Sequence, residues 1–205
     1  MKQSSSEKEQ EIAPGIPPEA DKPAPGKTGK HAKLTIREMA VFSMFGSLMF
    51  ATTIAMSALP NVHLLGMFIT LLTVVYRVKA LIPLYIFVFI YGLYYGFATW
   101  WLPYLYIWTI LWGAVMLLPR KMPKRIATIV YPVVAGLHGL LFGTLWAPAQ
   151  MIFMMTKDSF SWEGILAWIA VGLPYDAVHG AGNFVFGFLV YPLSVLLRKL
   201  EKMPV

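Results

Sequence analysis

Three polar side chains follow one another at helical spacing near the C-terminal end of the chain. Asp176, His179 and Asn183 stand at positions i, i+3 and i+7, which places them on one face of a helix. Ionisable groups are costly inside an apolar helix, so their presence there needs a reason. We interpret this face as the wall of a ligand pocket. The alternative is that Asp176 caps its helix and that His179 and Asn183 join helices to one another.

A fourth polar group, His138, lies inside another apolar segment. Its neighbours Gly136, Gly139 and Gly143 are typical of a surface where two helices pack closely, rather than of a cofactor-binding loop. His138 faces the same cavity as His179, or it is a hydrogen-bonded histidine of the interior. The sequence leaves both readings open.

Further candidates surround the expected pocket. Tyr104 and Trp108 are one helical turn apart, and we expect them to stack on a flat aromatic ligand. An aromatic belt at the membrane surface is the alternative. Asn61 and His63 lie in the first outer loop, from which we expect them to close over the ligand, and Gln150 lies near the outer rim.

Several kinds of catalytic chemistry have no sequence support. The chain has no cysteine, which excludes disulfides, thiol catalysis and Cys-based metal sites. Neither the HExxH pattern nor the GxSxG pattern occurs. We therefore expect no metal site, no cofactor and no catalytic residue. A small membrane enzyme that uses Asp176, His179 and His138 is the alternative.

The composition indicates that these residues are held in a membrane. Hydrophobic residues make up 58% of the 205 residues and charged residues 13%, whereas a soluble domain carries about a quarter charged residues. The net charge of +7 resides in tails and loops. Lys and Arg are not interleaved with aromatic residues along one surface, which argues against binding of nucleic acid.

The apolar segments predict an all-α integral membrane protein. Residues 1–35 are rich in Pro, Lys, Glu and Ser, so we expect a disordered cytoplasmic tail. A span needs about 20 residues, and residues 36–200 form a predicted bundle of six transmembrane helices. The expected spans are about 37–59, 62–78, 80–100, 103–118, 126–147 and 174–197. Pro174 suits the first turn of the last helix, so 162–173 is expected to be a short separate outer segment.

The positive charges predict the orientation of this bundle. With both ends in the cytoplasm, the inner tail, loops and C-terminal end hold 16 of the 17 Lys and Arg residues. The outer segments hold only Lys157. Positive residues favour the cytoplasmic side, so an N-in/C-in arrangement follows.

The first span also carries small residues at every fourth position: Ser43, Ser47, Ala51 and Ala55. Such a stripe lets another helix approach closely. It is expected to contact a partner protein, or else to pack inside the same bundle.

Together these features resemble the substrate-binding S component of energy-coupling factor (ECF) vitamin transporters. The resemblance covers about residues 36–200. It rests on the six expected spans, the small-residue stripe and the run Pro174-Tyr-Asp-Ala-Val-His-Gly-Ala-Gly-Asn. In the family the coupling motif is Ala-xxx-Ala in the cytoplasmic half of the first helix. Here that half carries Ser43 and Ser47, and Ala51 and Ala55 lie deeper.

The resemblance implies a protein that is not an enzyme and that captures a vitamin or related micronutrient at its outer face. It implies a bacterial plasma membrane location and, as partners, a transmembrane coupling subunit and two cytoplasmic ATPases. The chain itself has no Walker A sequence. The expected pocket holds Asp176 but no Lys or Arg, so we expect a neutral or cationic substrate with an aromatic ring. A stand-alone secondary transporter is a further alternative.

Overall fold

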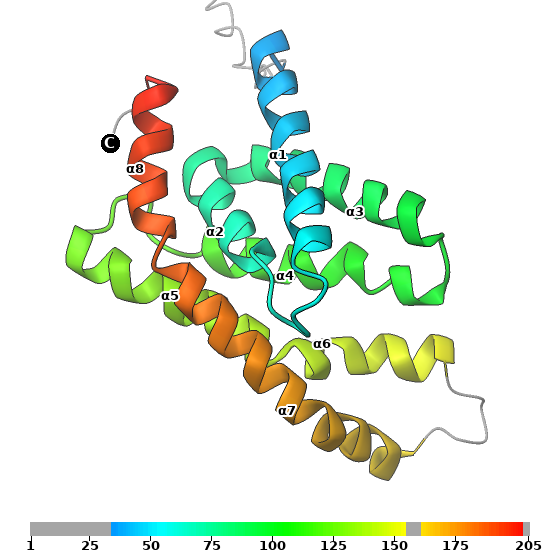
Figure 1. Cartoon of the computed structure of the whole chain (residues 1–205). Helices are drawn as coiled ribbons and strands as arrows, with labels where there is room; N and C mark the ends of the chain where they lie inside the picture. Colours follow the sequence, from blue (N-terminus) through cyan, green and yellow to red (C-terminus); the bar gives the residue numbers. More distant parts are fainter. Residues whose placement is uncertain (1–33, 155–160, 203–205) are drawn as a thin grey trace, which may run out of the picture. The chain divides into compact units, whose positions relative to one another are not determined.

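The computed structural model describes residues 34–154 and 161–202 of the chain (Figure 1). Within these residues every element of secondary structure is a helix, which confirms the all-helical class for this part. The α-helices are α1 (Ile36–Ala55), α2 (Leu65–Tyr76), α3 (Leu81–Tyr95), α4 (Tyr104–Met116), α5 (Lys124–Leu140), α6 (Phe142–Ala149), α7 (Trp162–Gly187) and α8 (Val190–Leu200). Three short turns, η1 (Arg77–Ala80), η2 (Thr99–Trp101) and η3 (Gln150–Met154), extend or connect them.

Some of these helices have the length and apolar character that a membrane span needs. They are α1, with 20 residues, and the run Leu65–Tyr95, with 31. Two bent pairs qualify if each pair is one span: α5 with Phe142–Ile152, bent by 42°, and α7 with α8, bent by 46°. The described residues therefore contain two to four candidate spans. The count of six stays a prediction.

Helix α2 is the most deeply buried element of the bundle. All 12 of its residues are buried, and it packs against α4, α7 and α8. A helix that is apolar on every side is stabilised when other helices surround it. The short second segment of the sequence is thus a central helix.

The fifth expected span differs from the structure at its outer end. Instead of one helix over 126–147, α5 ends at Leu140 and α6 begins at Phe142 after a bend. Pro148 lies inside α6 and does not end it. Because a new helix starts here, its first N–H groups have no partner within the helix. They are available to a side chain of α7.

The last span also differs from its expected boundaries. Pro174 lies in the interior of α7, which begins at Trp162 and continues to Gly187. Ser161 sets this start, because its side chain accepts a hydrogen bond from the Gly164 N–H at 3.0 Å. The segment 162–173 is therefore not separate. The chain bends only between α7 and α8.

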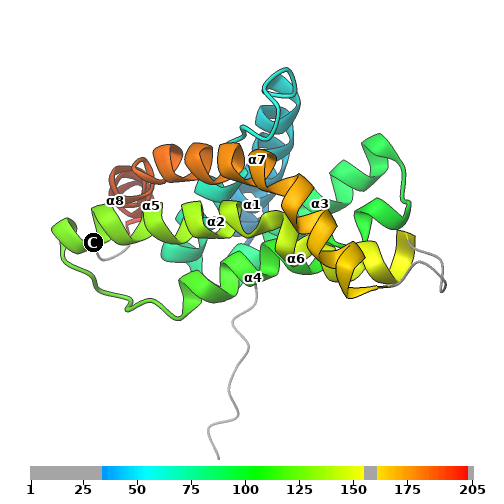
Figure 2. The ribbon, with the colours of Figure 1, turned by 90° about the horizontal axis from the view of Figure 1, so that it is seen from below.

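Helices α5 and α7 run side by side at unusually close range (Figure 2). A Cβ atom added at Gly139 would lie 2.9 Å from the Cα of Gly180, and one at Gly187 would lie 2.5 Å from the Cα of Pro132. Only glycine allows the two backbones to approach so closely. The expectation that the glycines around His138 form a packing surface is confirmed.

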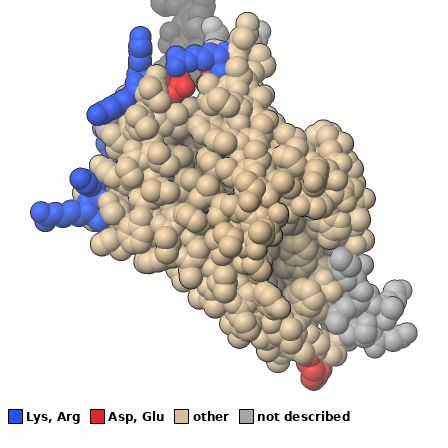
Figure 3. All heavy atoms as spheres, in the orientation of Figure 1, with Lys and Arg blue, Asp and Glu red and all other residues tan. Residues whose placement is uncertain are grey.

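The Lys and Arg side chains of the described part gather on one side, where α1 begins, α8 ends and α5 begins (Figure 3). Lys79 pairs with Glu38, and Arg37 lies 3.3 Å from Glu201. Arg198 donates to the backbone oxygen of Val74 at 2.8 Å. These contacts tie the start of α1 and the end of α8 to the C-terminal end of α2 and to η1.

Candidate functional site

Three of the seven buried polar residues among the described ones are satisfied by their own helix. Thr70, Thr73 and Ser194 each donate to a backbone oxygen one turn earlier. The other four buried polar residues are His138, Asp176, His179 and Asn183. All four were candidates from the sequence, and three of them meet at one place.

Five rings converge at the centre of the bundle. The His179 ring on α7 lies 4.7 Å from that of His63, 4.8 Å from Phe142 and 6.5 Å from Trp108, measured between centroids. Trp108 on α4 lies 5.6 Å from His138 on α5. His63 comes from the loop between α1 and α2. These five residues and Asn183, one helical turn from His179, are called the central cluster.

The central cluster holds polar atoms that are buried and have no hydrogen-bond partner among the described residues. They are His63 Nδ1, Trp108 Nε1, His138 Nδ1, His179 Nε2, Asn183 Nδ2 and Asn183 Oδ1. A buried polar group left unpaired costs about 1–3 kcal/mol. Six such atoms in one cluster are typical of a site that another molecule completes.

His138 shows the hydrogen-bonded arrangement that is one of its two readings from the sequence. Its Nε2 lies 3.0 Å from the backbone oxygen of Ile107, so the ring is anchored to α4. Its Nδ1 has no partner and belongs to the central cluster. His138 is thus an anchored interior histidine, and its place in a ligand pocket stays a prediction.

Asn183 lies between two helix backbones. A Cβ atom added at Gly66 on α2 would lie 2.6 Å from its Oδ1, and one added at Gly139 on α5 would lie 2.8 Å from its Nδ2. The two glycines therefore make the room that the amide occupies. The residue is only 1% exposed.

Asp176 has a defined structural partner. Both of its carboxylate oxygens lie 3.0 Å from the backbone nitrogen of Gly143, in the first turn of α6. The carboxylate therefore caps α6, where negative charge is stabilised. It does not cap its own helix, which starts at Trp162. Its role in ligand binding stays a prediction.

Tyr104 links the central cluster to a second group of aromatic residues. Its ring stacks on Tyr91 at 5.3 Å and lies 5.9 Å from Trp108 and 5.6 Å from Trp146. Tyr104 and Trp108 thus stand together, as their spacing in α4 predicts. In the described part, no hydrogen bond joins Asn61, which is exposed, or Gln150, at the start of η3, to the central cluster.

Phe142 is a member of the cluster that sequence reasoning missed. It stands four residues after His138, where a continuous helix would have put it on the same face. That spacing was an available signal. Trp146, four residues further on, continues the same row, 5.8 Å from Phe142.

In residues 34–154 and 161–202, no three His, Asp or Glu side chains form a group able to hold a metal ion. The Nε2 of His138 is already engaged by Ile107. The rings and amide of the central cluster instead offer hydrogen bonds and flat apolar faces.

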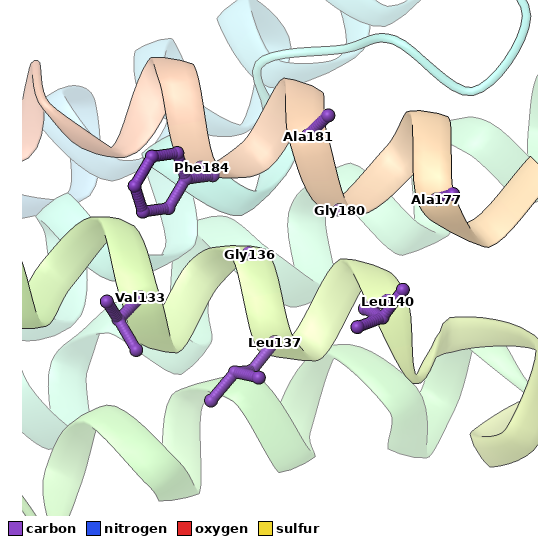
Figure 4. Close-up of a pocket in the computed structure, with 8 residues that line it drawn as sticks. All are labelled: Val133, Gly136, Leu137, Leu140, Ala177, Gly180, Ala181 and Phe184. Carbon is purple, nitrogen blue, oxygen red and sulfur yellow. The ribbon is translucent and has the colours of Figure 1, made fainter.

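A separate groove lies between α5 and α7 (Figure 4). It is lined by Val133, Gly136, Leu137, Leu140, Ala177, Gly180, Ala181 and Phe184. These side chains offer no hydrogen bond. The groove shares no residue with the central cluster.

The small-residue stripe of α1 faces away from the described bundle. Ser43, Ser47, Ala51 and Ala55 are all exposed. The face that α1 buries carries Phe42, Phe45, Gly46 and Met49 instead. The stripe is therefore not used for packing inside the part of the chain that the structure describes.

No protein-family model, no curated protein and no solved structure matches this chain.

Proposed function

We propose that this chain is the substrate-binding subunit of an ECF-type importer, which binds a vitamin or related small micronutrient at its outer face. The observation that carries the proposal is the set of six unpartnered polar atoms in the central cluster. They are surrounded by rings from α4, α5, α6, α7 and the loop before α2. Such a mixture of flat apolar faces and a few free polar atoms is typical of a small-molecule site.

The distribution of charge supports an outward-facing site. Helix α1 begins beside the Arg37–Glu201 and Glu38–Lys79 pairs, where Lys and Arg gather (Figure 3). Its other end leads into the loop that carries His63. Positive residues favour the cytoplasmic side of a membrane. The central cluster then lies toward the outer side of a six-helix, N-in/C-in protein in the plasma membrane.

The exposed stripe of α1 supports a partner protein. Ser43, Ser47, Ala51 and Ala55 leave a helix face onto which another helix backbone packs closely. The partners in this proposal are a transmembrane coupling subunit and two cytoplasmic ATPases. They provide the energy for import, since this sequence has no Walker A motif.

Co-purification and transport together test the proposal. The full-length chain, tagged and purified from its own membrane, is expected to bring down a polytopic subunit and two ATPases. Uptake is expected to require ATP and all of these partners. Transport in liposomes that contain this chain alone would refute the proposal in favour of a carrier. Substrate turnover by the purified chain that His179→Ala abolishes would refute it in favour of an enzyme.

A further inference from the structure

We infer that the central cluster binds a neutral, planar ring compound whose edge carries an N–H next to a C=O, and that Asn183 reads this edge. The inference rests on the proposed function for the location of the site. It adds the chemical class of the substrate. It is carried by the donors and acceptors that the described residues leave free.

The amide of Asn183 defines the edge. Its Nδ2 and Oδ1 are both buried and both unpartnered. An amide has a donor and an acceptor side by side, so it pairs through two parallel hydrogen bonds with a partner that has an acceptor beside a donor. A ring lactam or imide has this pattern. Any partner without an N–H leaves Oδ1 unpaired.

His138 supplies an acceptor of known identity. Its Nε2 faces the backbone oxygen of Ile107, and a carbonyl oxygen only accepts. In the neutral ring the hydrogen must therefore be on Nε2, which leaves Nδ1 as an acceptor. Trp108 Nε1, by contrast, is only a donor. The ligand must therefore present at least one more donor and one more acceptor.

The free donors and acceptors of the central cluster exclude strongly charged ligands. A phosphate or carboxylate offers acceptors and would leave His138 Nδ1 and the Asn183 oxygen unpaired. A quaternary ammonium compound offers no N–H at all. The one buried carboxyl side chain in the described part is Asp176, and both of its oxygens already face Gly143. The broader expectation of a neutral or cationic substrate is thereby narrowed to a neutral one.

The rings of the cluster favour a planar ligand. Trp108 meets His138 at an interplanar angle of 38° and Phe142 at 45°, and His63 meets His179 at 68°. These rings contact one another at centroid separations of 5.6, 5.3 and 4.7 Å, and a flat ring packs against such a group through offset and edge contacts. A saturated or branched compound lacks this fit.

The test uses the full-length chain in lipid nanodiscs and pairs of probe compounds measured by calorimetry. Lumichrome, 6-methylpterin and thymine are each compared with a derivative in which the ring N–H next to the C=O is methylated. Thiamine and pyridoxal phosphate serve as the cationic and anionic probes. At least one of the three unmethylated compounds, called the parent rings, is expected to bind. Methylation of its ring N–H is expected to lower the affinity by about tenfold or more.

Substitution of Asn183 shows whether this residue reads the edge. In Asn183→Leu, the parent ring and its methylated derivative are expected to bind equally weakly. In Asn183→Asp, which keeps an acceptor for the ring N–H but loses the donor to the ring C=O, the parent ring is expected to bind more weakly while its preference over the methylated derivative is kept. A ratio of affinities is compared within each variant, so a partial loss of folded protein does not alter it.

Three outcomes would overturn the inference. They are tightest binding by thiamine or pyridoxal phosphate, binding by none of the parent rings, and unchanged discrimination in Asn183→Leu. The ATPase co-purification described above does not depend on the ligand. If the ATPases co-purify but no parent ring binds, only the substrate class is wrong. If the rings bind through Asn183 but no ATPase is found, only the proposed function is wrong.

Discussion

Replacement of Gly139 by alanine tests whether the contact between α5 and α7 builds the central cluster. A Cβ atom at Gly139 would lie 2.8 Å from Asn183 Nδ2, 2.9 Å from the Gly180 Cα and 2.9 Å from the His179 oxygen. Two of these three atoms belong to the backbone of α7, so rotation of a side chain cannot relieve the overlap. The helices must move apart, and Asn183 must move with α7.

The size of the effect follows from a matched control. Gly113→Ala places the same methyl group in α4, where no neighbouring atom lies within 4 Å of it. Both variants gain the same helix propensity, so their difference isolates the overlap, which costs about 1–3 kcal/mol. For a chain of this size that corresponds to a Tm roughly 2–12 °C lower for Gly139→Ala.

Thermal unfolding in detergent and ligand binding provide the readouts. Gly139→Ala is expected to lower both the Tm and the affinity, because the overlap moves Asn183 as well as α7. Gly113→Ala is expected to leave the affinity unchanged and to keep or raise the Tm. Equal Tm values and equal affinities for the two variants would refute the close contact from which we place Asn183.

Two further substitutions separate structural from functional roles. Asp176→Asn keeps one acceptor for the Gly143 N–H but removes the charge at the start of α6. We therefore expect the free energy of unfolding to fall by about 0.5–2 kcal/mol and the ligand affinity to stay nearly unchanged. Lost binding at an unchanged Tm would show instead that the carboxylate contacts the ligand. Ala51→Phe fills the exposed stripe of α1 and is expected to reduce co-purification of the coupling subunit. The control Ala170→Phe changes a residue that is also exposed but lies on α7, and it is expected to leave co-purification unchanged. Equal recovery of the coupling subunit with both variants would refute the docking role of the stripe.

The sequence predicted the polar members of the site better than the boundaries of the helices. Helical spacing placed His179 and Asn183 on one face, and their polar side chains inside an apolar segment predicted that they act at the same site. Tyr104 and Trp108 met for the same reason. In each case local geometry was sufficient, because residues one turn apart in a helix are always neighbours.

The boundaries depended on contacts that the sequence does not display. Pro174 is typical of a helix start, but a helix already capped by Ser161 runs through it at the cost of one backbone hydrogen bond. The break before α6 was missed because Asp176, far along the chain, satisfies its first turn at Gly143. This long-range partner also gave Asp176 a role that neither sequence reading assigned to it.

The remaining question is whether the polar atoms of the central cluster serve the fold or a ligand. A polar residue that ties helices together is bonded to them, and its removal destabilises the protein. Neither polar atom of the Asn183 amide has a partner in the described residues. A buried amide in this state costs about 1–3 kcal/mol, which an apolar side chain of similar shape does not.

Asn183→Leu therefore gives opposite results for the two roles. Leucine has the same branching as asparagine, so we expect the ligand-free Tm to stay unchanged or rise while ring binding is lost. Asn183→Asp puts a charge in the same place and is expected to lower the Tm, because a buried unpaired charge is costlier than an amide. A clear fall in the ligand-free Tm of Asn183→Leu, matching that of Asn183→Asp, would mean that Asn183 holds helices together. A ligand-free Tm that is unchanged or raised in Asn183→Leu and lowered in Asn183→Asp would mean that the chain gives up stability at Asn183 to keep a site for its ligand.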